Sequence, residues 1–199
     1  MKRKNTSCLS FLLILVIAGV GFWLLWCAQN VPEAGTYGEA DRIIAAFAAE
    51  NGLELSDYPE ELRALLERNP ETEEFVLRYP LDQDKAVDVD LSAYEHTDGV
   101  PLFLQWDAQW GYLEYGGKPA ALTGCGPMCL SMAAYSLTGD EAYSPDKMLE
   151  FADENGYYSP GSGSSWTLIS KGGVKLGFDV TEIPLVKKRI FDNLEAGNP

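Results

Sequence analysis

The sequence of 199 residues predicts an α+β fold that is dominated by helices and preceded by an apolar N-terminal segment. Three observations support this prediction. Most segments between residues 39 and 195 carry apolar residues three or four positions apart, which is the spacing of an amphipathic helix. The two runs typical of strands, 100–104 and 178–183, are short and come late in the chain. Residues 8–28 form an uncharged apolar run of bilayer-spanning length.

Residues 1–30 are expected to form a membrane anchor. The basic flank Lys2-Arg3-Lys4 precedes the apolar run, so the N-terminus is predicted to lie in the cytoplasm and the rest of the chain outside the cell. A cleaved signal peptide, which would yield a secreted protein, is the alternative. The residues around Trp26 and Cys27 fit poorly the small residues that signal cleavage requires. We therefore expect a single membrane-spanning segment.

The composition is strongly acidic, with 15 Lys and Arg against 30 Asp and Glu and a formal net charge of −15. Nucleic-acid binding needs clustered positive charge, so no nucleic-acid partner is expected. Cys8 and Cys27 lie in the apolar run, which leaves Cys125 and Cys129 in the rest of the chain. The sequence therefore predicts no disulfide framework, despite the expected export.

Residues 31–98 are predicted to be a helical leader region that ends in a polar connector. A linker covers residues 30–38, and helices follow at 39–51, at 56–68 and from 70 to the residue before Pro80. Residues 99–199 are predicted to form the main domain. Its expected elements are a strand at 100–104, a helix at 125–137 ended by Gly139, a helix at 144–155, a Ser/Gly loop at 159–165, a helix at 166–176, a strand at 178–183 and a helix at 185–195.

Cys125 stands at the start of a predicted helix, within Gly124-Cys125-Gly126-Pro127. The glycines permit a tight turn, and Pro127 suits the first helical turn, where its missing N–H is not needed. A thiol in this place lies beside unpaired backbone N–H groups and the positive end of the helix dipole, and both favour the nucleophilic thiolate. A buried structural cysteine is the alternative, and the motif alone does not decide between the two.

A cysteine that acts on acyl groups also needs a general base, a group that orients the base, and donors for the oxyanion. The N–H of Cys125 supplies one donor, and the side-chain amide of Gln105 is the candidate for the second, with a surface glutamine as the alternative. Cys125 and Cys129 have the i, i+4 spacing of half a zinc site, but no second pair of ligands follows. We therefore expect no metal and no cofactor, and we assign Cys129 to the core.

Five motifs follow one another along the chain: Pro101–Asp107, Trp110-Gly111-Tyr112, Gly124–Pro127, Leu137-Thr138-Gly139 and Gly161–Trp166. In this order they resemble the family-thirty-nine-like cysteine peptidases of bacteria, which have a papain-like fold. The resemblance extends over roughly residues 57–199 and implies a peptide or protein substrate. It also implies that Cys125 is the nucleophile and that Gln105 belongs to the oxyanion hole. Substrate-binding positions implied by it are Gly124, Gly163 and Trp166.

The chain departs from this family in the catalytic base. The family's base is a histidine that follows the cysteine, with an Asp or Asn partner, whereas no histidine follows Cys125 here. The only histidine, His96, lies upstream in the polar connector and is expected to be a surface residue. Residues 195–199 resemble the turn before the first strand of the family's sheet. We therefore expect residues 99–199 to form the helical half of a papain-like domain, with the C-terminal β-sheet half missing.

The sequence thus predicts a membrane-anchored extracellular cysteine peptidase that hydrolyses peptide or amide bonds through a thioester at Cys125, inactive in this truncated form. The alternative is a non-enzymatic cell-surface binding module with a degenerate peptidase-like cleft. A binding module is expected to be stable as it stands, whereas a peptidase domain without its sheet is expected to be molten or aggregated.

Overall fold

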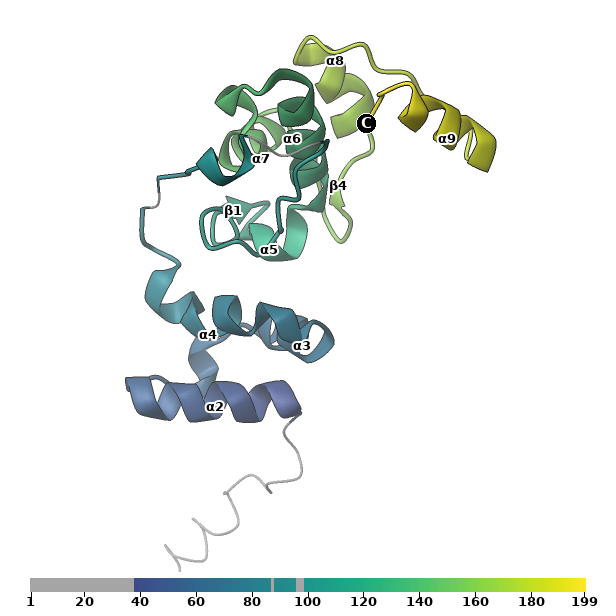
Figure 1. Ribbon diagram of the computed structural model, residues 1–199. Helices are drawn as coiled ribbons and strands as arrows, with labels where there is room; N and C mark the ends of the chain where they lie inside the picture. Colours follow the sequence, from purple (N-terminus) through teal and green to yellow (C-terminus); the bar gives the residue numbers. More distant parts are fainter. Residues whose placement is uncertain (1–37, 87, 96–98) are drawn as a thin grey trace, which may run out of the picture. The chain divides into compact units, whose positions relative to one another are not determined.

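The computed structural model describes residues 38–86, 88–95 and 99–199 (Figure 1). The predicted membrane anchor, most of the linker and His96 lie outside these ranges. No helix within the ranges is both long and apolar enough to cross a bilayer. Residues 40–199 form one compact unit.

The three helices predicted for the leader region are confirmed. They are α2 (Glu39–Asn51), α3 (Glu60–Arg68) and α4 (Glu73–Asp82), and short 3-10 turns at Leu55–Asp57 and Pro70–Thr72 precede the second and third. Leu62, Leu65 and Leu66 are buried on one face of α3. Contrary to the prediction, α4 continues through Pro80. The missing N–H of a proline removes one hydrogen bond of the helix, and the last turn is still closed by the N–H of Gln83, which donates to the Tyr79 carbonyl at 3.0 Å.

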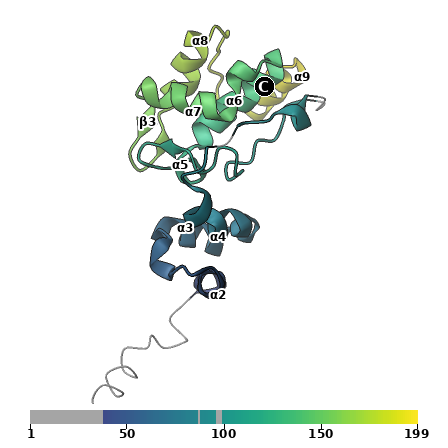
Figure 2. The same ribbon diagram turned by 90° about the vertical axis from the view of Figure 1, so that its left-hand side faces the viewer.

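The remaining described residues form short helices and two small hairpins (Figures 1 and 2). The helix α6 carries the cysteine motif and packs against α7. In chain order the elements are a 3-10 turn (Ser92–Tyr94), β1 (Glu114–Tyr115), β2 (Lys118–Pro119), α5 (Ala120–Thr123), α6 (Cys125–Thr138), a 3-10 turn (Glu141–Tyr143), α7 (Pro145–Glu154), β3 (Tyr158–Ser159), β4 (Gly163–Ser164), a π-helical turn (Leu168–Gly172), α8 (Gly173–Lys175) and α9 (Lys187–Glu195).

The α+β class is confirmed in its coarse form, because the described residues are rich in helices and their strands form only the antiparallel pairs β1–β2 and β3–β4. Both predicted strands, 100–104 and 178–183, are wrong, since these residues are irregular. The hydrogen bonds of the Leu104 carbonyl explain why residues 100–104 do not form a strand. This carbonyl accepts hydrogen bonds from the Trp110 indole at 2.8 Å and from the Asp107 N–H at 3.1 Å, and not from a neighbouring strand. A short apolar run forms a strand only where a partner strand is available.

Two hydrophobic clusters form the core. The first surrounds α6 and α7 and contains the fully buried rings of Trp110 and Tyr115. The second joins α2, α3 and α4 to residues just before the cysteine motif, including Ala121. In this second cluster the Phe75 ring stacks on Tyr112, with 4.2 Å between ring centroids and 13° between planes. The leader helices therefore share a core with the segment that leads into Cys125.

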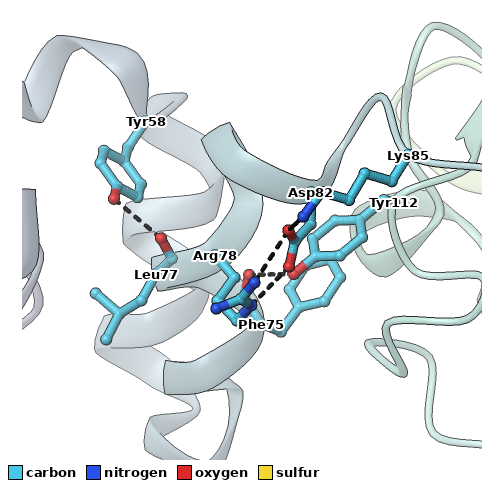
Figure 3. A network of polar contacts seen from close by, with 7 residues as sticks. All are labelled: Tyr58, Phe75, Leu77, Arg78, Asp82, Lys85 and Tyr112. Atoms are coloured by element: carbon cyan, nitrogen blue, oxygen red, sulfur yellow. Dashed lines mark hydrogen bonds and ion pairs between the residues drawn. The ribbon is translucent and has the colours of Figure 1, made fainter. Parts of the chain in front are cut away.

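Polar contacts reinforce this second cluster (Figure 3). The Tyr112 hydroxyl donates to the Phe75 carbonyl at 2.9 Å. At the end of α4, the Asp82 carboxylate accepts from Arg78 Nε and from Lys85 Nζ, each at 2.6 Å. These two hydrogen bonds lower the pKa of Asp82. Because the cations are largely exposed and screened by solvent, the ion pairs contribute little to stability, and the aromatic packing dominates.

Candidate functional site around Cys125

Cys125 is the first residue of α6 and is exposed, which confirms the predicted helix start. A break at Gly124 separates α6 from the short helix α5. The Gly124 N–H donates to the Ala120 carbonyl at 2.7 Å, and the next helix begins with the Met128 N–H donating to the Gly124 carbonyl at 3.0 Å. At its other end α6 stops at Gly139, whose φ of 65° is the left-handed conformation expected of a helix-ending glycine.

Gln105 contacts the backbone at this break. Its side-chain Nε2 donates to the carbonyls of Ala120 at 2.8 Å and of Ala121 at 2.9 Å. In a continuous helix the Ala121 carbonyl would accept the Cys125 N–H, four residues further on. The break at Gly124 makes Cys125 a first-turn residue of α6, whose N–H has no acceptor within that helix. Gln105 therefore supports the helix break that places Cys125 at the start of α6.

The hydrogen bonds of Gln105 bear directly on its predicted role as an oxyanion donor. A primary amide has two N–H donors, and both are used by backbone carbonyls. Gln105 can bind an oxyanion only if it releases one of these hydrogen bonds. As it stands, the structure places Gln105 as a support of the turn before Cys125.

Two glycines allow the loop between β3 and β4 to approach the start of α6. A Cβ on Gly126 would lie 2.6 Å from the Ser164 side chain. Gly163 has a φ of +76°, and a Cβ there would lie 2.8 Å from the Thr123 carbonyl. The Ser164 hydroxyl shares a hydrogen bond of 2.9 Å with the Tyr115 hydroxyl, which fixes the loop against the core.

Cys125 opens into a pocket of about 380 Å³. One wall comes from the leader region, because Glu61, Ala64 and Arg68 of α3 line the pocket. This contribution was not predicted, since it depends on packing between residues that lie far apart in the sequence. The other lining residues are Lys118, Leu122, Thr123, Tyr158 and Gly161–Gly163.

Of the predicted substrate-binding positions, Gly163 lines this pocket together with Cys125. Gly124 is buried in the turn, and a Cβ at this position would lie 2.8 Å from the Ala120 carbonyl. Its backbone can thus shape the pocket without presenting a side chain to it. Trp166 is 90% exposed and does not belong to the residues lining the pocket. The structure therefore brings Gly163 to the cysteine but does not bring Trp166 there.

The assignment of Cys129 to the core is wrong, because this residue is exposed. The buried face of α6 runs instead through Met128, Ser131 and Tyr135, which follow the three- to four-residue period of the helix. Although part of its side chain reaches solvent, desolvation by neighbouring groups raises the pKa of the Cys129 thiol, and the negative charge of a Cys125 thiolate adds to this shift. Cys129 is thus a second accessible thiol with a disfavoured thiolate.

A general base is not apparent beside Cys125. The titratable side chains that line the pocket with it are Glu61, Arg68, Lys118 and Tyr158. His96 lies outside the described residues, and no histidine follows the cysteine. Within the described ranges, no cluster of three or more His, Cys, Asp or Glu side chains is placed to hold a metal ion.

No protein-family model matches the chain, and neither a curated protein nor a solved structure matches it. The resemblance to the family-thirty-nine-like peptidases therefore rests on the sequence motifs and stays a prediction.

Proposed function

We propose that this protein is an extracellular, membrane-anchored cysteine peptidase of the papain-like type, with Cys125 as its nucleophile. One observation carries the proposal. Cys125 is an accessible thiol at the start of a 14-residue helix, it opens into a pocket, and its backbone N–H has no acceptor within that helix. A nucleophile and an oxyanion donor at the same position are the minimum that acyl transfer requires.

In the proposed reaction, the thiolate sulfur attacks the carbonyl carbon of the substrate, and the developing oxyanion is received by the N–H groups at the start of α6. Expulsion of the amine then leaves a thioester on Cys125, which water hydrolyses. Expulsion of an amine needs a proton, and attack by water needs a base. Since no histidine follows Cys125, acylation by an activated ester is the step that these residues can carry out without further groups.

The test is acylation by a peptide thioester, whose thiolate leaving group needs no proton. The full chain in detergent is mixed with the thioester at pH 7.5, and acylated peptides are quantified by mass spectrometry after digestion. We expect Cys125 to be acylated faster than Cys129, because desolvation raises the pKa of the Cys129 thiol and so lowers its thiolate fraction at this pH. Equal acylation of both thiols, or preferential acylation of Cys129, would contradict the proposal.

Matched variants identify the nucleophile. Cys125→Ser should abolish the fast acylation, and Cys129→Ser should leave it unchanged. Added imidazole should then accelerate loss of the acyl group from Cys125, because it supplies the base that a histidine provides in a cysteine peptidase. An acyl group that imidazole removes from Cys129 just as fast would indicate ordinary thioester chemistry without a site.

Attachment through residues 8–28, with the remaining chain outside the cell, is part of the same proposal. It rests on the length of the apolar run and on the basic residues that precede it. The protein should stay with membranes during alkaline carbonate extraction, and protease added to intact cells should degrade it. Release of a shorter chain into the medium would favour the secreted alternative.

The second candidate is a non-enzymatic binding module at the cell surface, and the missing histidine favours it. It predicts a stable chain that binds no hydrophobic dye, and peptide binding that survives Cys125→Ser. The peptidase interpretation predicts a poorly stable chain that binds hydrophobic dyes, and apolar side chains exposed on and before α9 support this expectation. They include Leu185, Val186, Phe191 and Leu194.

A further inference from the structure

We infer that the pocket beside Cys125 selects peptides that carry a carboxylate group, and that Arg68 of α3 binds this group. The inference rests on the proposed function, because it names the substrate class of the same site. It follows from the charges that line the pocket, from the way α3 is fixed, and from the chemistry of the guanidinium group.

The pocket has a local excess of positive charge in an acidic protein. Its charged lining residues are Glu61, Arg68 and Lys118. Lys118 Nζ lies 2.9 Å from Glu61 Oε1, so these two charges offset each other. Arg68 is exposed, and no carboxylate of the described residues lies within ion-pair distance of it. The uncompensated charge beside the thiol is therefore positive, although the whole chain carries −15.

The position of Arg68 relative to the pocket is set by the core. Glu61, Ala64 and Arg68 are spaced by three and four residues, so they lie along one face of α3. Leu62, Leu65 and Leu66 fill the other side of the helix and are buried in the second hydrophobic cluster. That cluster also contains Ala121, four residues before Cys125. The guanidinium group is thus presented to the pocket by a packed helix and not by a mobile loop.

An arginine in this place suits a carboxylate, because its planar guanidinium donates two parallel hydrogen bonds to the two oxygens. A purely structural role is also available, since Arg68 lies in the last turn of α3, where a positive charge interacts favourably with the helix dipole. The two roles differ in what they predict. An arginine that faces the pocket makes the reactivity of Cys125 depend on the charge of the reagent, and one that binds a ligand also makes acylation depend on a carboxylate in the substrate.

The first experiment uses two methanethiosulfonate reagents of opposite charge, the anionic sulfonatoethyl and the cationic trimethylammonioethyl compounds. Each transfers its thioalkyl group to a thiolate, which forms a mixed disulfide and releases methanesulfinate. Their rates at Cys125 and Cys129 are measured in the full chain by mass spectrometry after digestion. Cys129 is an internal reference, because its raised pKa slows both reagents equally and cancels in the anion-to-cation ratio of rates.

We expect the anion-to-cation ratio of rates to be higher at Cys125 than at Cys129. Arg68→Gln should lower the ratio about fivefold at Cys125 alone, because it removes one partly screened positive charge near the reacting sulfur. Arg42→Gln, which removes an exposed arginine of α2 that does not line the pocket, is the matched control and should change neither ratio. Thermal unfolding of each variant checks the fold. A ratio that is unchanged in a folded Arg68→Gln variant overturns the inference.

The second experiment locates the carboxylate with peptide thioesters. One donor carries a glutamate in its acyl part, one carries glutamine there, and a third is neutral in its acyl part but carries a carboxylate on its thiol leaving group. Faster acylation of Cys125 by either acidic donor, lost in Arg68→Gln, supports the inference and shows on which side of the scissile bond the group binds. Equal rates for all three donors overturn it while leaving the proposed nucleophile intact. If no donor acylates Cys125 although the reagent ratio depends on Arg68, the proposed function fails and the anion-binding pocket stands.

Discussion

Replacement of Phe75 by alanine tests whether the leader helices and the cysteine segment form one cooperative unit. Phe75 belongs to α4 and is 5% exposed, and its ring stacks on Tyr112, in the turn before β1. Close approach is possible because Gly111 lies against the ring, where a Cβ would come within 2.7 Å of Phe75 Cε2. Phe75→Ala therefore removes the central contact between two segments that are far apart in the sequence.

The expected loss of stability follows from this burial. A fully buried phenylalanine truncated to alanine costs about 3–5 kcal/mol, which includes the cavity left behind. The stacked pair contributes about 0.5–1.5 kcal/mol of this beyond the buried area. A double-mutant cycle with Tyr112→Leu should therefore give a coupling free energy of about 1 kcal/mol. Urea unfolding followed by circular dichroism measures each of these values.

A second readout tests whether the two segments unfold together. If they do, circular dichroism should show a single transition in urea, and Phe75→Ala should shift that whole transition to lower urea concentration. Phe191→Ala, on the half-exposed surface of α9, is the control and should change stability by less than about 0.5 kcal/mol. Two separate transitions, with only the first one shifted by Phe75→Ala, would refute a shared core.

Three further outcomes are expected. Alkylation of Cys129 should rise with pH along a curve whose midpoint lies above 9.0, since the pKa of this thiol is raised; a midpoint at or below that value would contradict the desolvation argument. Gly126→Ala should destabilise the protein by about 1–3 kcal/mol, as measured by urea unfolding, because the new Cβ would lie 2.6 Å from the Ser164 side chain. Burial raises the pKa of Tyr112 above its ordinary value of 10.0, so its contribution to stability is complete below pH 10 and declines as the pH rises further and the unfolded chain ionises. Tyr112→Phe should therefore lose less stability than the wild type between pH 9 and 11, and an equal loss in both proteins would show that this tyrosine does not titrate on unfolding.

Helices were predictable from the sequence because their signals are local. The glycine after α2, the apolar stripe of α3 and the Gly-Cys-Gly-Pro start of α6 each depend on residues within one or two turns. Strands were not predictable in the same way. Residues 100–104 are apolar, as in a short buried strand, but their pairing depends on a partner, and the Leu104 carbonyl is bonded to Trp110 and Asp107. The short helix α5 was missed, since four residues carry too little pattern to be distinguished from a turn.

The candidate site was likewise predictable only where its signals are local in the sequence. Position 125 was predictable because the residues that place it at a helix start are its immediate neighbours. The wall from α3 was not, because Arg68 and Cys125 meet only through packing of the second hydrophobic cluster. The misplacement of Cys129 has a different cause. An apolar stripe through Cys129 and Met132 and one through Met128 and Ser131 both fit the period of a helix, and only the position of α7 decides which face is buried.

Gln105 shows how a residue can serve a site without pointing into it. The motif resemblance assigns its amide to the oxyanion, whereas the structure uses both amide hydrogens on the carbonyls of Ala120 and Ala121. The second of these carbonyls is the natural acceptor of the Cys125 N–H in an unbroken helix. Pro127 has no N–H to donate to the Thr123 carbonyl, so a continuous helix through α5 and α6 is already disfavoured, and the Gln105 amide holds two carbonyls at the break. In the structure Gln105 therefore acts by fixing the turn that places Cys125 at the start of α6, and its role as an oxyanion donor stays a prediction.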